Sequence, residues 1–277
     1  MVEVPGEPDA SVELIDHDPD RRVDLLGADG LDRAYVALSS PLGIEALPAD
    51  AARPLLDAWH EGAAALPAEL GAWAAPSVSE PDPGHLGELL DRGFAGACLP
   101  AEALASAAGF DRCGGLLELL DARGAPLLVH PGPGPDTLGA PAIGGETAAV
   151  PFWWPAVTRY VAAMNAAWHA FARFGRPSHP RLRVCFAMLA GLAPLHRERL
   201  LARGGLAAPD PDVFLDTSSY GPRAVDAMIR ELGVDALAYG SDRPVTSAQE
   251  LALGEAVELA LRVRNPARLL SLAEVTV

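Results

Sequence analysis

Short apolar runs alternate with amphipathic stretches along this chain from about residue 34 onward. The apolar runs have the length of buried strands, and the stretches between them show the three- and four-residue spacing of apolar positions that is typical of helices. Runs that predict strands lie at residues 34–39, 70–75, 94–99, 126–130, 182–188, 213–217 and 236–240. Stretches that predict helices lie at residues 51–65, 85–92, 113–123, 155–174, 194–203, 223–232 and 248–262.

Glycine and proline separate these elements, and the predicted strands are apolar along their whole length. Strands that alternate with helices pair in parallel through right-handed crossovers. Continuously apolar strands are typical of a sheet that is covered on both faces. We therefore predict an α/β fold, a TIM-type (β/α)8 barrel that forms a single domain over residues 1–277. Such a barrel has eight strands, and the pattern supplies seven.

The segment before residue 34 supplies only part of an eighth unit. Residues 20–26, with Gly30-Leu31-Asp32 after them, predict an outer helix and its exit turn, and residues 12–15 (VELI) form a short alternating run. Either this run closes the barrel, or the first strand precedes the start of this chain; we favour the second interpretation. An open strand edge invites pairing with other chains. We expect this segment, a loop or a second subunit of a homo-oligomer to cover it.

Composition and charge exclude several classes of function. The net charge of −16 argues against binding to nucleic acid or to an anionic membrane surface. All 21 basic residues are arginines, which excludes a Schiff-base lysine and a phosphate-loop lysine. We find no signal-peptide pattern and no run near the roughly 20 apolar residues of a membrane span. Cys98, Cys113 and Cys185 predict buried free thiols, and a reduced, cytoplasmic setting follows.

Two predicted strands deliver a potential metal ligand at their carboxyl ends. His130 ends the apolar part of LLVHPG at residues 127–132, and Asp242 lies in YGSDRP at residues 239–244. Active sites of parallel barrels lie at this end of the strands, so we predict that both side chains face the barrel mouth. There Asp242 can bind a divalent cation and take a proton from water that the cation activates. The alternatives are a histidine bonded to backbone in the turn, and an aspartate that caps the next turn or pairs with Arg243.

Further candidates surround this pair. Ser218 and Ser219, in DTSSYG at residues 216–221, can orient a substrate or cap the following helix. Trp153 and Trp154 end the Pro/Gly-rich loop 131–151, whose length favours a functional role; they can wall a substrate or fix the loop to the barrel. Arg243 is a possible substrate contact. The other histidines predict surface or packing residues, with the first as an outside candidate: His17, His60, His85, His169, His179 and His196.

Several segments resemble the amidohydrolase superfamily, in particular the branch related to aminocarboxymuconate-semialdehyde decarboxylase. They are LLVHPG, the segment 191–194 with ERL at 198–200, FLDTSSYG at 214–221, YGSDRP, and NPARLL at 265–270. The resemblance covers most of the chain from about residue 16. It implies a distorted eight-stranded barrel that holds a divalent metal, commonly zinc. The family's ligands are a His-x-His from the first strand, a histidine ending the fifth, which His130 matches, and an aspartate ending the eighth, which Asp242 matches.

Two departures from that ligand set leave the function open. The chain contains no His-x-His, and Met188 stands where the family has a histidine after the sixth strand. A thioether is a poor ligand for such cations, and a catalytic zinc generally has three protein ligands. One hypothesis is a metal-dependent hydrolase or non-oxidative decarboxylase that acts on a small organic substrate through His130 and Asp242. The other is a catalytically inactive barrel retained for small-molecule binding or assembly.

Overall fold

The computed structural model describes residues 18–140, 150, 151 and 153–272 of the chain. Its strands are β1 (Ala34–Val36), β2 (Leu70–Ala72), β3 (Ala97–Pro100), β4 (Leu127–His130), β5 (Val184–Phe186), β6 (Val213–Asp216) and β7 (Leu237–Ala238). Each strand overlaps one of the seven predicted runs. The predicted run 12–15 and His17 lie outside the described residues.

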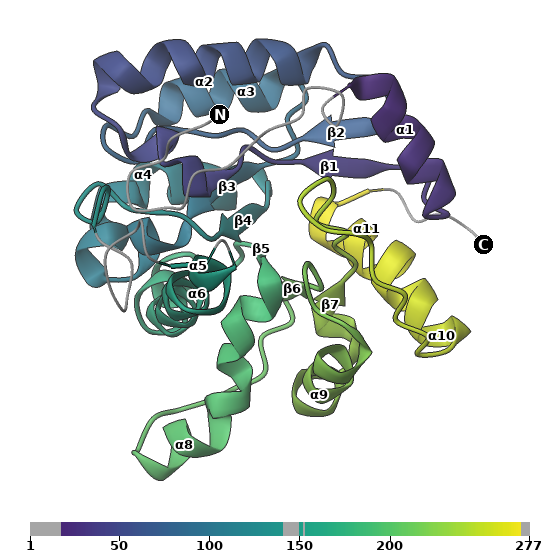
Figure 1. The fold of residues 1–277 in the computed structure, drawn as a ribbon. Helices are drawn as coiled ribbons and strands as arrows, with labels where there is room; N and C mark the ends of the chain where they lie inside the picture. The colour runs from purple at the N-terminus through teal and green to yellow at the C-terminus, as the bar shows by residue number, and fades with distance from the viewer. Residues whose placement is uncertain (1–17, 141–149, 152, 273–277) are drawn as a thin grey trace.

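All strand pairs are parallel and follow the order of the chain. β1 pairs with β2, and β3 to β7 form one continuous sheet. The two sheets join at a bridge between Ala74 and Ala97, next to which the Cys98 N–H donates to the Ala74 carbonyl at 2.7 Å. The described residues therefore supply seven strands of the predicted parallel barrel, around which the helices are arranged (Figure 1).

Helices connect the strands on the outside of the barrel. The α-helices are α1 (Pro19–Ala28), α2 (Ala49–Ala64), α3 (Pro83–Asp91), α4 (Ala107–Arg123), α5 (Trp154–Val157), α6 (Arg159–Ala170), α7 (Arg176–Ser178), α8 (Arg197–Ala202), α9 (Pro222–Leu232), α10 (Glu255–Leu259) and α11 (Asn265–Leu270). Shorter helical turns are η2 (Ser40–Leu42), η3 (Ile44–Ala46), η4 (Ala101–Leu104), η7 (Met188–His196) and η8 (Val234–Ala236). Two π-helical turns, η6 (Phe171–Gly175) and η9 (Ala260–Arg264), continue α6 and α10.

Local sequence explains several helix boundaries. Asp18, Asp82 and Ser106 each accept a hydrogen bond from the backbone N–H three residues further on, and so cap α1, α3 and α4. The helix predicted over residues 248–262 begins only at residue 255, because Gly254 has a φ of 93° that a right-handed helix does not admit. None of the described helices is long and apolar enough to span a membrane.

Alternate residues of each strand pack in two separate layers. Leu127 and Val129 of β4 belong to the large cluster that lies between the strands and the outer helices. Leu128 instead packs inside the barrel, in a smaller cluster whose buried members are Trp73, Cys98, Leu128, Cys185, Phe214 and Leu269. As the sequence predicted, all three cysteines are free and buried. This alternation decides which side chains near the strand ends point inward.

The C-terminal helices occupy the space between β7 and β1 (Figure 1). Tyr239, just after β7, donates its N–H to the Leu261 carbonyl of η9 at 2.9 Å, which satisfies one group on that strand edge. At the amino end of the barrel, α11 places Leu269 among the interior side chains, and Arg183 Nε donates to the Leu269 carbonyl at 2.8 Å. Helical residues thus cover an edge that the sequence predicted to need protection.

Candidate functional site

His130 is the last residue of β4, and its side chain faces the barrel interior, because it follows the inward Leu128 by two positions. Its Nδ1 lies 3.0 Å from the Pro131 carbonyl oxygen. A carbonyl only accepts, so Nδ1 carries the proton and Nε2 keeps its lone pair. Burial lowers the pKa of His130, although this hydrogen bond and the charge of Asp242 act to raise it. The ring is therefore held in a neutral form that can bind a cation.

Asp242 follows β7 at the same end of the barrel. Its backbone is left-handed, with a φ of 55°, which aspartate tolerates better than most residues. The Ser219 hydroxyl donates to Asp242 Oδ2. Burial raises the pKa of Asp242, while the Ser219 hydrogen bond and the charge of His130 lower it. His130 ends β4 and Asp242 follows β7, so both lie at the carboxyl end of the barrel, where the charge of each acts on the pKa of the other.

Asp216, the last residue of β6, is a third ionisable side chain at this rim and is absent from the predicted set. Its Oδ1 accepts hydrogen bonds from the backbone N–H of Met188 at 3.1 Å and of Ser218 at 2.9 Å. Burial raises the pKa of Asp216 to about 6; these hydrogen bonds oppose the rise, and the charge of Asp242 adds to it. The signal was present in the sequence, because Asp216 ends the apolar run VFLD just as His130 ends LLVH.

Small neighbours give the Asp216 carboxylate its space. His130 and Asp216 end strands that are two apart in the sheet, so their backbones are separated by roughly 10 Å. Ala187 follows the strand between them, and Ala238 pairs with Asp216 on the other side. A Cβ added at Gly240 would lie 3.0 Å from Asp216 Cγ, closer than ordinary contact allows. Glycine at position 240 is therefore what lets the carboxylate turn into the mouth.

The segment after β5 forms a turn of left-handed helix within η7. Met188 and the four residues after it all have φ between 48° and 62°. For residues other than glycine this conformation costs roughly 1–2 kcal/mol each. The hydrogen bond from Met188 N–H to Asp216 offsets part of that cost, and Gly191 lies so close to α6 that an added Cβ would be 2.6 Å from the Val161 carbonyl oxygen. The backbone N–H of Met188 thus serves to fix Asp216.

The remaining predicted site residues have partners of their own. Arg243 donates two hydrogen bonds to Asp29, at 2.6 and 2.8 Å, so its guanidinium is directed toward the end of α1. Trp153 is 56% exposed, and its ring lies 5.7 Å from that of Trp154, centroid to centroid. Of the two predicted serines, Ser218 donates its backbone N–H to Asp216 and Ser219 donates its hydroxyl to Asp242. Contacts of these residues with a substrate stay predictions.

A second group of potential ligands lies between α2 and α3. Asp57, His60 and His85 form the one set of three among the described residues whose ligand atoms lie within 4.8 Å of one another. His60 is 2% exposed, and its Nε2 accepts the Ala75 N–H at 3.1 Å. Burial lowers the pKa of His60 to about 4, so the ring is neutral and its single proton is on Nδ1, which has no partner among the described residues. A metal would have to displace that proton, so this group fits a cation less well than His130 does.

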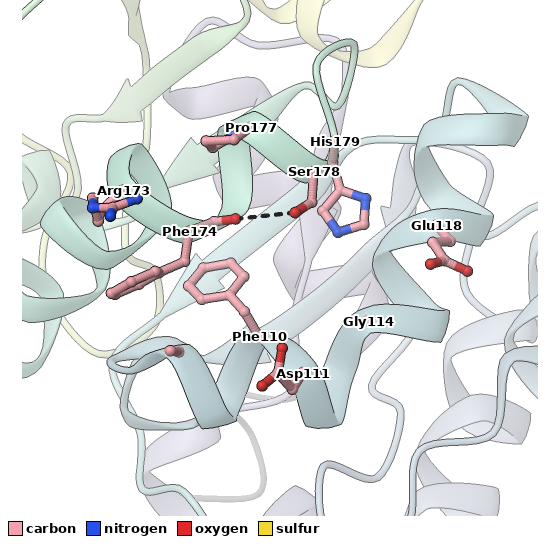
Figure 2. Close-up of a pocket in the computed structure, with 10 residues that line it drawn as sticks. Phe110, Asp111, Gly114, Glu118, Arg173, Phe174, Pro177, Ser178 and His179 are labelled. Atoms are coloured by element: carbon pink, nitrogen blue, oxygen red, sulfur yellow. Dashed lines mark hydrogen bonds between the residues drawn. The ribbon is translucent and has the colours of Figure 1, made fainter.

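The cavity in Figure 2 also lies away from the rim. It has a volume of about 460 Å³ and lies between α4 and residues 173–179. Phe110 and Glu118 line it from α4, and Phe174 and His179 line it from the other side. None of its lining residues follows the carboxyl end of a strand, so it adds nothing to the site around His130.

Solved structures provide the comparison for this fold. A protein described as amidohydrolase II has a TM-score of 0.73 over 98% of this chain and 92% of its own, at 18% identity. A 5-carboxyvanillate decarboxylase from Novosphingobium aromaticivorans has a TM-score of 0.73 over 91% of this chain and 80% of its own, at 14% identity. A 2,6-dihydroxybenzoate decarboxylase from Rhizobium has a TM-score of 0.67 over 91% and 88%, at 21% identity. The chain has the barrel fold of the amidohydrolase-type decarboxylases.

This fold confirms the resemblance seen in the sequence and the predicted TIM-type architecture. No protein-family model matches the chain, and no curated protein matches it. At these identities the amidohydrolase-type fold is shared, and the chemistry must be argued from the side chains at the mouth.

Proposed function

We propose that this protein is a divalent-metal-dependent, non-oxidative decarboxylase of a small aromatic carboxylic acid. The observation that carries the proposal is the convergence of His130 and Asp242 at the barrel mouth, where each shifts the pKa of the other. The similar structures support the substrate class. The 5-carboxyvanillate decarboxylase was determined with manganese and a nitrobenzoic acid, and a dihydroxybenzoic acid decarboxylase from Polaromonas with manganese and 2-nitroresorcinol.

The donor atoms at the mouth fit a divalent cation. His130 offers an unprotonated Nε2, because its Nδ1 proton is held by the Pro131 carbonyl. Asp242 offers carboxylate oxygens, and a set of imidazole and carboxylate donors suits manganese as well as zinc. When bound, such a cation supplies positive charge that attracts an anionic substrate and stabilises negative charge that develops during the reaction.

The reaction requires a proton as well as a cation. The bond between the ring carbon and the carboxyl carbon breaks, CO₂ leaves, and the electron pair stays on the ring carbon, which must then take up a proton. The substrate's own carboxyl group can supply this proton: Asp242 would take it up and return it to the ring carbon. The Ser219 hydroxyl, which donates to Oδ2, orients the Asp242 carboxyl group.

Product formation from a panel of hydroxybenzoic and carboxyvanillic acids tests this function in protein reconstituted with Mn²⁺ or Zn²⁺. We expect at least one acid to lose its carboxyl group, detected by chromatography of the arene product. His130→Ala and Asp242→Asn should each lower the rate about a hundredfold or more. Asp212→Asn, just before the amino end of β6, is the matched control and should keep wild-type activity. Cleavage of esters or amides without release of CO₂ would contradict the proposal in favour of a hydrolase.

Met188 supports a second candidate, a catalytically inactive barrel, because it stands where the related family has a histidine. Such a protein would still bind small molecules at the mouth or assemble with other copies. Under this alternative the same aromatic acids raise the melting temperature of the wild-type chain, while no acid in the panel is turned over with either metal.

A further inference from the structure

Asp216 lies at the same rim as His130 and Asp242, and backbone N–H groups hold one of its two oxygens. The N–H groups of Met188 and Ser218 both bond to Oδ1, so Oδ2 is the oxygen that the backbone does not hold. Asp216 ends β6 on the inward face, as His130 ends β4. Its neighbours on the adjoining strands, Ala187 and Ala238, have small side chains.

Two carboxylates at this rim lack a counter-ion. Neither Asp216 nor Asp242 forms an ion pair with an arginine or histidine among the described residues. Both carboxylates are only partly exposed, and Gly240, two residues before Asp242, lies against the Asp216 carboxyl group, where an added Cβ would be 3.0 Å from Cγ. Two like charges held near each other and partly out of water are unfavourable. A divalent cation between them would relieve both the burial cost and the repulsion, with the neutral Nε2 of His130 as its nitrogen donor.

We propose that Asp216 is the third protein ligand of the divalent metal, beside His130 and Asp242, in place of the ligands that a first-strand His-x-His provides in the related family. The inference rests on the proposed function, whose metal site it completes to the three protein ligands that a catalytic site generally has. One nitrogen and two carboxylate donors form a harder site than one rich in histidine, so the preference for Zn²⁺ over Mn²⁺ should be smaller here.

The three ligand side chains must move toward one another on binding. Among the described residues, the ligand atoms of His130, Asp216 and Asp242 are not all within 4.8 Å of one another, unlike those of the group between α2 and α3. A metal that the protein binds could therefore lie either at the rim or between α2 and α3. The experiment has to distinguish these two sites.

Titration of the metal-stripped, full-length chain with Mn²⁺, followed by calorimetry and by the electron paramagnetic resonance of free Mn²⁺, measures binding without reference to turnover. We expect Asp216→Asn to weaken Mn²⁺ binding at least tenfold and His130→Ala to abolish it. Asp212→Asn, just before the amino end of β6, and Asp57→Asn, in the group between α2 and α3, should both bind as the wild type does.

The possible outcomes separate this inference from the proposed function. If Asp216→Asn binds Mn²⁺ as tightly as the wild type while His130→Ala does not, Asp216 is not a ligand, and the decarboxylase proposal stands. If the wild type binds neither Mn²⁺ nor Zn²⁺, both proposals fail. Loss of Mn²⁺ binding in Asp57→Asn but not in Asp216→Asn or His130→Ala would place the metal site between α2 and α3 and overturn the inference.

A structure of the wild-type chain with Zn²⁺ decides the question without any substitution, and so does not depend on the folding of a variant. An Asp216 oxygen within about 2.0–2.2 Å of the ion would confirm the ligand. An ion bound to His130 and Asp242 with Asp216 still held only by Met188 and Ser218 would refute it.

Discussion

Asp216→Asn should stabilise the metal-free protein at neutral pH, although it weakens the proposed metal site. Burial raises the pKa of Asp216 from 3.8 to about 6, so the folded protein holds this proton more tightly than the unfolded chain. As the pH rises from about 4 to about 6, the unfolded state loses the proton first, and the free energy of unfolding falls. Above this window the ionised carboxylate destabilises the fold by a constant amount.

The magnitude follows from the pKa shift. At about 1.4 kcal/mol per pKa unit, the rise corresponds to about 3 kcal/mol. An asparagine side chain has nearly the same shape, and its amide oxygen can accept the same N–H groups of Met188 and Ser218, now at 3.1 and 2.9 Å from Oδ1. The substitution therefore removes the charge and keeps the contacts. We expect a gain of up to about 3 kcal/mol at pH 8 and almost none near pH 3.5.

Urea unfolding followed by circular dichroism, in the presence of a chelator and at pH values from about 3.5 to 8, measures this difference. Asp32→Asn is the control, since Asp32 is exposed and its substitution should change stability by less than about 0.5 kcal/mol at every pH. A gain in stability that does not depend on pH, or a loss of stability at pH 8, would show that the charge of Asp216 does not destabilise the folded protein.

Three further predictions concern packing and metal. Gly240→Ala should lower the free energy of unfolding by about 1–3 kcal/mol and weaken Mn²⁺ binding, because the new methyl group would strike Ser218 and the Asp216 carboxylate. Its control is Gly62→Ala, where an added Cβ has no atom within 4 Å and should raise the free energy of unfolding by about 0.5–1 kcal/mol. Equal effects of the two substitutions would contradict the argument. Arg159→Met should lower the free energy of unfolding in urea by about 3–5 kcal/mol, because the largely buried Glu102 loses the guanidinium that now lies 2.9 Å away. A loss under 1 kcal/mol would show that this ion pair contributes little to stability. Mn²⁺ at a hundred times its dissociation constant should add about 2.7 kcal/mol of stability, seen as a rise in melting temperature that EDTA reverses.

The architecture could be predicted because it depends on local pattern. Each of the seven apolar runs contains or overlaps a strand, and their alternation with helices leads directly to parallel pairing. The site was predictable only where a ligand follows a strand as a single conspicuous side chain, as His130 and Asp242 do. Asp216 was overlooked because the serines and threonine beside it suggest substrate contacts or a helix cap. Its importance depends on the backbone N–H groups of Met188 and Ser218 and on the space left by Gly240.

Other features depend on contacts between residues distant in the sequence. Arg243 follows β7 next to Asp242, yet its partner is Asp29, 214 residues earlier. The left-handed turn after β5 contains a single glycine, so its four other residues give no sign of positive φ. The helix predicted from residue 248 fails for a similar reason, since Ala252 has a φ of 49° that its composition does not suggest.

The position of Leu269 has a consequence for biosynthesis. Trp73 and Cys98 emerge from the ribosome early, but their hydrophobic neighbourhood is complete only after α11 has been translated. Nascent chains of this protein should therefore expose apolar surface until α11 has emerged, and they should depend on chaperones that shield it. Stalled or prematurely stopped products that end before α11 should be degraded or should aggregate, even though they contain all the strands that the structure describes.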